Sequence, residues 1–177
     1  FYTQWCGPCL NMAQTVFSLP TVGYYYNQTF INLKIDAEEG EGITLAKKYG
    51  VRSYPTYAFI DPATEEIVHH SSSRQTPEQF IQTGKDATVP TKRSFYLQDQ
   101  YTQGNRARAF LIDYINYPYS GYARTTVQTA FDEFITGGAK LTDPDVCEVY
   151  VNTINGMNPY LKQVSANYAE LCQRFGK

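Results

Sequence analysis

Two cysteines spaced three residues apart at the start of an expected helix constrain this chain more than any other feature. The segment reads Trp5-Cys6-Gly7-Pro8-Cys9. Pro8 suits a first helical turn, because its missing N–H loses no intrahelical bond there. Cys6 would then lie at the helix N-terminus, where free N–H groups and the helix dipole lower a cysteine pKa from about 8.5 into roughly the 3.5–7.5 range. The spacing predicts a redox pair in which Cys6 attacks a disulfide and Cys9 completes the exchange.

A metal site and two incidental core cysteines are the other interpretations of this pair. A zinc site needs about four ligands, but His69 and His70 are adjacent in the sequence, and Cys147 and Cys172 lie far downstream. We therefore expect redox chemistry with no metal and no organic cofactor, and surface positions without a catalytic role for the two histidines. The downstream cysteines lie on separate expected helices, so a disulfide between them or two buried thiols both fit, with buried thiols favoured.

A second segment, residues 47–59, ends an expected helix and begins an apolar strand with a proline. Proline has no N–H to donate, so it fits this place only if no neighbouring strand needs a hydrogen bond from it. Together, the WCGPC motif and the "YGV-x-x-YPT" segment resemble the active-site loop and the cis-proline loop of the thioredoxin family. The resemblance implies that the Tyr54–Pro55 peptide bond is cis and packs against the Cys6–Cys9 pair, with Tyr54 facing the substrate.

The resemblance also implies a function, a thiol–disulfide oxidoreductase in which Cys6 is the nucleophile and Cys9 resolves the mixed disulfide. The residues expected to contact substrate are Trp5, Gly7, Pro8, Tyr54 and Pro55. The Gly-Pro pair between the cysteines matches reducing thioredoxins, whose potential lies near about −270 mV, against about −120 mV for strong oxidants. The expected partners are proteins with disulfides and an unidentified electron donor.

The order of elements up to residue 89 fits a thioredoxin-like α/β fold. Helices are expected at 7–17, 21–27, 41–49 and 76–86, and strands at 30–35, 55–60 and 66–71. The last two strands form a hairpin, and Thr76 with Pro77 suits a helix start.

The family places a central strand directly before the redox motif, between the strands at 30–35 and 55–60. Only residues 1–3 occupy that place, so we expect the chain to lack the first strand or strands of the fold. The buried acid that family members often carry six residues before the first cysteine falls outside the numbering, and Asn32 stands where thioredoxins often carry a lysine.

Residues 88–92 are the expected junction between a thioredoxin-like domain, 1–89, and an all-α domain, 93–177. Five further helices are expected, at 94–102, 106–117, 122–136, 145–154 and 159–175. They form either a small bundle or a tetratricopeptide-like array, although no self-similarity at about 34 residues is found. Aromatic residues recur along them at helical spacing, which favours a core position over a peptide groove: Phe110, Tyr114, Tyr117, Phe131, Phe134, Tyr160 and Tyr168.

Charge, hydropathy and composition of the 177-residue chain bear on nucleic-acid binding, membrane spans and cellular location. The 15 basic and 17 acidic residues are nearly balanced, and nothing in the sequence indicates the clustered basic surface of a nucleic-acid binder. No apolar run reaches the roughly 20 residues of a membrane span. The 16 tyrosines, with abundant Asn and Gln, favour the cell envelope or periplasm over the cytoplasm.

The alternative function is a polypeptide-binding or chaperone-like module in which the redox activity is secondary.

Overall fold

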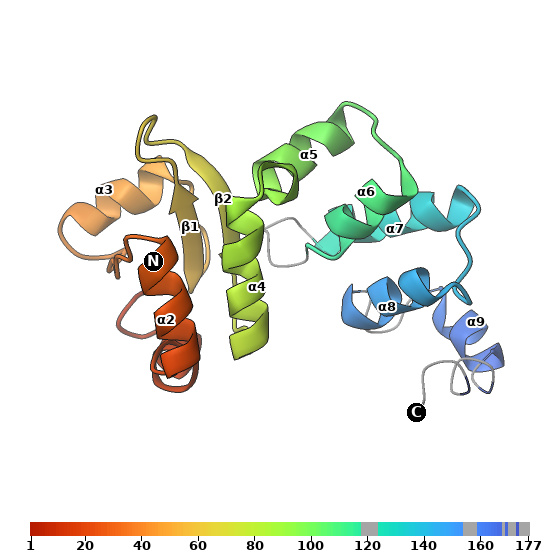
Figure 1. Cartoon of the computed structure of the whole chain (residues 1–177), viewed down its shortest axis with the longest axis horizontal. Coiled ribbons are helices and arrows are strands. Elements are labelled where there is room, and N and C mark those ends of the chain that lie inside the picture. The colour runs from red at the N-terminus through yellow and green to blue at the C-terminus, as the bar shows by residue number, and fades with distance from the viewer. Residues whose placement is uncertain (118–123, 154–158, 168, 170–172, 174–177) are drawn as a thin grey trace. The chain divides into compact units, whose positions relative to one another are not determined.

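The structure is a computed structural model that describes residues 1–117, 124–153, 159–167, 169 and 173. The chain divides into two compact units, and the division lies between Tyr96 and Leu97 (Figure 1). The first unit has a small sheet with helices, and the described part of the second is helical. The division falls within helix α5 (Ser94–Thr102), a few residues beyond the junction expected at 88–92. The domain limits 1–89 and 93–177 themselves stay a prediction.

Apart from the segment 30–35, the first unit follows the element order expected of an α/β thioredoxin-like fold. Its helices are α1 (Gly7–Met12), the π-helical turn η1 (Ala13–Phe17), α2 (Pro20–Thr29), α3 (Glu41–Lys48), α4 (Pro77–Thr88) and the 3-10 turn η2 (Pro90–Lys92). Its strands are β1 (Thr56–Ile60) and β2 (Ile67–Ser72), which pair antiparallel with a register shift after Phe59. The expected hairpin is confirmed.

The core of this unit joins the helix that follows the redox motif to α2 and α4. Its buried members are Met12, Val16, Val22, Tyr26 and Phe80. The rings of Tyr26 and Phe80 stack with centroids 4.3 Å apart, and the Tyr26 hydroxyl donates to the Phe80 carbonyl at 2.6 Å. Helix α4 begins with the expected cap, because Thr76 Oγ1 accepts from the Gln79 N–H while Gln79 Oε1 accepts from the Thr76 N–H. These contacts hold α1 and α4 on one core.

The strand expected at 30–35 is wrong. The structure has a single parallel bridge there, between Tyr2 and Asp36, and the side chains of Ile31 and Leu33 are 93% and 77% exposed. A strand exists only where a neighbouring ladder satisfies its N–H and C=O groups. Among the described residues this segment meets such a neighbour only at its end, where Tyr2 N–H donates to the Ile35 carbonyl at 3.0 Å. An alternating apolar sequence is therefore not sufficient for a strand here.

The two histidines of β2 correct a second expectation, since His69 is fully buried and His70 is half-buried. Ser94 covers them from the start of α5: its N–H donates to His69 Nδ1 at 3.0 Å, and its Oγ accepts from the His70 N–H at 3.0 Å. Burial, with smaller contributions from the charges of His70 and Arg93, lowers the pKa of His69 to about 3. Ser94 lies 25 positions after His69 in the sequence. No local sequence pattern around the histidines indicates this contact.

The described helices of the second unit surround an aromatic core, as expected. Besides α5 they are α6 (Arg108–Ile115), α7 (Arg124–Thr136), α8 (Pro144–Thr153) and α9 (Leu161–Ala166). Of the aromatic residues expected in this core, Tyr114, Tyr117, Phe131 and Phe134 are buried, Phe110 and Tyr160 pack against them, and Tyr168 lies outside the described residues. The tetratricopeptide-like arrangement stays a prediction. None of the described helices combines the length and apolar character needed to cross a membrane.

Candidate active site

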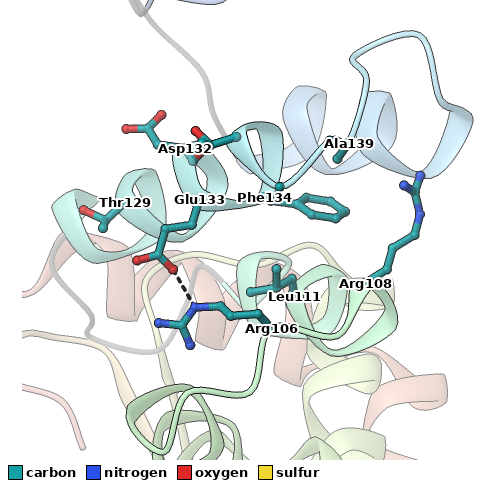
Figure 2. Close-up of a pocket in the computed structure, with 11 residues that line it drawn as sticks. Arg106, Arg108, Leu111, Thr129, Asp132, Glu133, Phe134 and Ala139 are labelled. Atoms are coloured by element: carbon teal, nitrogen blue, oxygen red, sulfur yellow. Dashed lines mark hydrogen bonds and ion pairs between the residues drawn. The ribbon is translucent and has the colours of Figure 1, made fainter.

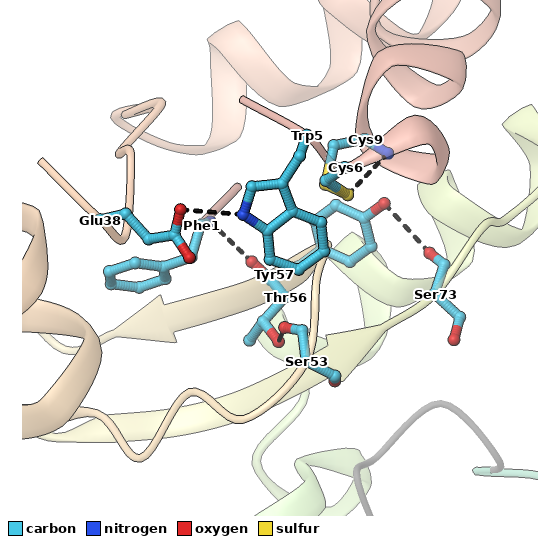
Figure 3. Close-up of a disulfide and its surroundings, with 9 residues drawn as sticks. All are labelled: Phe1, Trp5, Cys6, Cys9, Glu38, Ser53, Thr56, Tyr57 and Ser73. Atoms are coloured by element: carbon cyan, nitrogen blue, oxygen red, sulfur yellow. Dashed lines mark hydrogen bonds between the residues drawn. A yellow bond between two sulfur atoms is a disulfide. The ribbon is translucent and has the colours of Figure 1, made fainter. Parts of the chain in front are cut away.

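Cys6 and Cys9 form a disulfide at the N-terminal end of α1 (Figure 3). Their Cα atoms are 5.2 Å apart, and Cys6 is the N-cap of the helix. The Cys9 N–H donates to Cys6 Sγ at 3.1 Å. In the reduced protein the same N–H group and the helix dipole would stabilise negative charge on the Cys6 sulfur. Cys6 thus lies at the helix N-terminus, where the motif predicts it, and its role as the nucleophile stays a prediction.

The segment before the motif is held from both sides by backbone hydrogen bonds. The Phe1 nitrogen donates to the Thr56 carbonyl at 2.8 Å, and the Thr56 N–H donates back to the Phe1 carbonyl at 3.2 Å. On the opposite side, the Tyr2 N–H donates to the Ile35 carbonyl at 3.0 Å, and the Tyr2 carbonyl accepts from the Ala37 N–H at 2.8 Å. The Thr3 carbonyl accepts from the Cys6 N–H at 3.2 Å. Residues 1–3 therefore occupy the central position that the family resemblance implied. They anchor the start of α1 beside β1.

The loop before β1 reaches the redox motif directly. The Tyr54–Pro55 peptide bond is cis, as the resemblance implied, and Pro55 is buried. Its carbonyl accepts from the Ser73 N–H at 3.1 Å. The ring of Tyr54 meets the ring of Trp5 edge-on, with centroids 5.9 Å apart. The structure therefore brings together Trp5, Tyr54, Pro55 and the two cysteines from two separate segments.

Trp5 stands at the surface of the site, with 70% of its side chain exposed. Its Nε1–H donates to Glu38 Oε2 at 2.9 Å (Figure 3). The indole is thus held between Glu38 and the Tyr54 ring, and it offers an aromatic face to solvent. Glu38 belongs to no motif in the sequence. The only sequence signal for it is the group of acidic residues that follows residue 35. No motif indicates that one of them contacts Trp5, which lies 33 positions earlier.

The two cysteines are almost equally exposed to solvent in the disulfide form. Cys6 is 5% exposed and Cys9 is 7% exposed. Both cysteines are therefore buried while the disulfide is formed. Gly7 and Pro8 are exposed, so a substrate would approach over them.

Residues 73–75 form a further part of the site that the sequence analysis missed. Ser73 has a φ of 68°, a left-handed conformation that is uncommon outside glycine and that tends to occur at functional sites. The Tyr57 hydroxyl donates to the Ser73 carbonyl at 3.1 Å, and the Gln75 N–H contacts Met12 Sδ at 3.3 Å. Burial raises the pKa of Tyr57, which keeps its hydroxyl a hydrogen-bond donor. The turn is thereby tied to both Pro55 and α1.

Comparison with known proteins agrees with this geometry. Residues 1–84 match the family model for thioredoxin. These residues are a thioredoxin domain. Thioredoxin-1 of Drosophila melanogaster is 43% identical over 60 residues, which cover 34% of this chain and 51% of that protein. The protein disulfide-isomerase erp38 of Neurospora crassa is 32% identical over 74 residues, 42% of this chain and 20% of its own length.

A third relative, the protein disulfide-isomerase tigA of Aspergillus niger, is 31% identical over 94 residues, 50% of this chain and 26% of its own length. The chain thus spans about half the length of the thioredoxin and a smaller share of the isomerases. No solved structure matches the chain.

The second unit contains a pocket of about 790 Å³ beside α6 and α7 (Figure 2). Its two arginines already have acidic partners: Arg106 Nε lies 2.6 Å from Glu133, and Arg108 lies 3.0 Å from Asp143 and 2.6 Å from Asp145. The hydrogen bond from Arg108 lowers the pKa of Asp145, and hydrogen bonds from the Lys140 N–H and then from Arg108 lower the pKa of Asp143. Both arginines are thus paired with carboxylates, Asp132 accepts hydrogen bonds from Gln128 and Tyr160, and we assign no chemistry to the pocket.

Cys147 is a free, buried thiol within the described residues, and burial raises its pKa. This agrees with the favoured interpretation of that cysteine. Cys172 lies outside the described residues, so a pairing between the two is not described by the structure. Among the described side chains, His, Cys, Asp and Glu form no group of three or more that could bind a metal ion.

Proposed function

We propose that this chain is a thiol–disulfide oxidoreductase that reduces or exchanges disulfide bonds in proteins through Cys6 and Cys9. The observation that carries the proposal is the disulfide at the N-terminus of α1, with a backbone N–H directed at Cys6 Sγ. The thioredoxin domain and its similarity to thioredoxins and protein disulfide-isomerases support it.

The chemistry starts from the reduced pair. The Cys6 thiolate attacks one sulfur of the substrate disulfide, forming a mixed disulfide and releasing the other substrate sulfur as a thiolate that takes up a proton. Cys9 loses its proton and attacks Cys6 Sγ, which releases the second substrate thiol. Two electrons pass from the dithiol to the substrate, and the enzyme is left with the Cys6–Cys9 disulfide seen in the structure. An electron donor of unidentified nature then restores the dithiol.

Each residue around the pair has a proposed task in this cycle. Trp5 and Tyr54 offer aromatic surface beside the disulfide, and the exposed Gly7 and Pro8 leave the approach open. Pro55 positions the loop that would orient an extended substrate segment. The composition, rich in tyrosine, supports a location in the cell envelope, which fractionation of the source cells would test.

Reduction of insulin by dithiothreitol tests the proposal. We expect the full chain to accelerate insulin precipitation, and Cys6→Ser to abolish the acceleration because the nucleophile is lost. Cys147→Ala is the matched control, since it removes a cysteine outside the redox pair, and it should retain the activity. Retained activity in Cys6→Ser would contradict the proposal. Binding of unfolded protein that survives replacement of both redox cysteines would favour the polypeptide-binding module instead.

A further inference from the structure

The rim of the redox site beside Trp5 carries fixed negative charge. Glu38 is exposed, and its carboxylate accepts the Trp5 indole N–H at 2.9 Å. This hydrogen bond uses one carboxylate oxygen and leaves the charge of the group in place. Asp36 adds charge of the same sign, because its Oδ1 accepts from the Glu38 N–H at 3.0 Å and its Oδ2 accepts from Gln4 Nε2 at 2.8 Å. The anion is therefore held at the edge of the exposed indole.

This arrangement suits a cationic side chain better than any other kind. A lysine or arginine can lay its alkyl stem and positive head against an indole face, where the ring attracts the cation. With 70% of Trp5 exposed, the face is open, and the Glu38 carboxylate lies at its edge to receive the charge. A glutamate or aspartate in the same place would gain neither contact and would be repelled by Glu38.

The opposite side of the site has a different charge. Arg74 is exposed and follows Ser73, whose N–H donates to the Pro55 carbonyl at 3.1 Å. The site thus has an acidic group beside Trp5 and a basic group beyond Pro55. The acidic and the basic residue lie in different segments around the pair, so a charge preference is tested separately for each flank of the half-cystine.

We propose that Glu38 is a specificity-determining residue, which makes the site prefer protein disulfides with a lysine or arginine next to the half-cystine on the Trp5 side. The inference rests on the proposed function and names its substrate class. In an extended segment the neighbouring residue lies about 3.3 Å along the chain and its side chain points to the other face, so a long, flexible side chain such as that of lysine or arginine is needed to turn back to Trp5 when the substrate sulfur reaches Cys6. Glu38 takes no part in the sulfur exchange itself.

Four synthetic peptides test the inference with the reduced full chain. Each holds one cysteine in a mixed disulfide with nitrothiobenzoate, and carries either lysine or glutamate directly before or directly after that cysteine. Release of the coloured thiol gives a second-order rate constant for each peptide at low salt. We expect the lysine peptide to react about two- to fivefold faster than its glutamate counterpart for one of the two flanks, the scale of an exposed charge pair.

Two variants assign this preference to its cause. Glu38→Gln removes the charge but keeps an oxygen that can accept the indole N–H, and it should bring the lysine-to-glutamate ratio close to one. Glu66→Gln is the matched control, because Glu66 is exposed at the far end of the hairpin from Pro55, and it should leave the ratio unchanged. Raising the salt concentration to about 0.5 M should also compress the ratio, because exposed charges are screened.

Equal rates for lysine and glutamate peptides at both flanks would overturn the inference, and so would a preference that survives Glu38→Gln. In both cases the peptides are still reduced, so the proposed function stands. If no peptide is reduced by the dithiol form, the proposed function fails and the inference falls with it.

Discussion

Gly84 in α4 lies where two tyrosine rings of α2 approach the helix. A Cβ atom at Gly84 would lie 2.7 Å from Tyr25 Cε1 and 3.1 Å from Tyr26 Cζ. Tyr26 cannot easily give way, because its hydroxyl and its ring are both fixed on Phe80. Gly23, in the interior of α2, has nothing within 4 Å of the same position. The two glycines therefore separate the effect of crowding from the general cost of glycine in a helix.

We predict that Gly84→Ala lowers the free energy of unfolding by about 1–3 kcal/mol, the usual cost of overpacking a filled core. Gly23→Ala, its control, should raise the free energy of unfolding by about 0.5–1 kcal/mol, because alanine loses less backbone entropy than glycine in a helix. Urea unfolding followed by Trp5 fluorescence measures both, since Trp5 is the one tryptophan of the chain and lies in this unit. Equal effects of the two substitutions would show that the rings move aside.

Whether a residue of the candidate site could be predicted depends on how far away in the sequence its contact partner lies. Cys6, Cys9 and Pro55 were predictable because each belongs to a short motif whose spacing carries its chemistry. Glu38 and Ser73 were not, because their partners, Trp5 and Pro55, lie 33 and 18 positions away. Such contacts depend on the assembled fold, and a single sequence holds no local pattern for them.

Elements with their own end signals were predicted well, and those that depend on a partner were not. Helix α4 starts where Thr76 and Pro77 indicate, because the cap is made within four residues. The segment 30–35 has the composition of a strand, but its state depends on a neighbouring ladder that the described residues supply only at Tyr2. The same dependence applies to His69, whose ring accepts a hydrogen bond from Ser94 on another element.

The burial of His69 predicts a dependence of stability on pH. In the unfolded chain its pKa is about 6.5, whereas in the folded protein it is lowered to about 3. As the pH falls through this window, the unfolded chain binds a proton that the folded protein does not. The stability that is fully present above about pH 6.5 is therefore lost as the pH falls, by about 1.4 kcal/mol per pH unit for this one group.

We predict that His69→Gln removes this part of the pH dependence. The free energy of unfolding of the first unit, from urea titrations followed by Trp5 fluorescence between pH 5 and 6.5, should fall less steeply in the variant, by about 1 kcal/mol per pH unit. His70, whose pKa burial also lowers, contributes with the same sign and stays in the variant. An unchanged slope would mean that His69 accepts its proton in the folded protein. Overall destabilisation by the substitution would not change the slope.

At the scale of the whole molecule, the first unit extends further than the thioredoxin family match. The match ends at residue 84, whereas the compact unit continues to Tyr96. The extension has a physical cause, because the N–H and the hydroxyl of Ser94 satisfy His69 and His70 of the central hairpin. Ser94 is itself fully buried. The residues from 85 to 96 therefore belong to the first compact unit, and Ser94 bonds to its hairpin.

Two shortened chains test this reading. A chain that ends after Tyr96 should unfold, by Trp5 fluorescence, close to the midpoint of the full chain. A chain that ends after Val89 should be less stable by about 1–3 kcal/mol, because His69 loses the buried hydrogen bond from the Ser94 N–H. The Tyr96 form should reduce a small disulfide at nearly the full rate, since every residue proposed for the site lies before residue 76. Equal stability of the two forms would place the boundary before Ser94.

The Tyr96 form also tests whether the second unit takes part in catalysis. If the helices supply a docking surface, the shortened chain should lose rate on a protein substrate while it keeps its rate on a small disulfide, because binding energy away from the reacting sulfurs can be used in the transition state. The measurement is the ratio of full to shortened chain for insulin and for the small disulfide. Equal ratios would leave the helical unit with a structural role. We expect a larger ratio for insulin, because a protein substrate extends beyond the exposed ring of Trp5 and can contact a second surface.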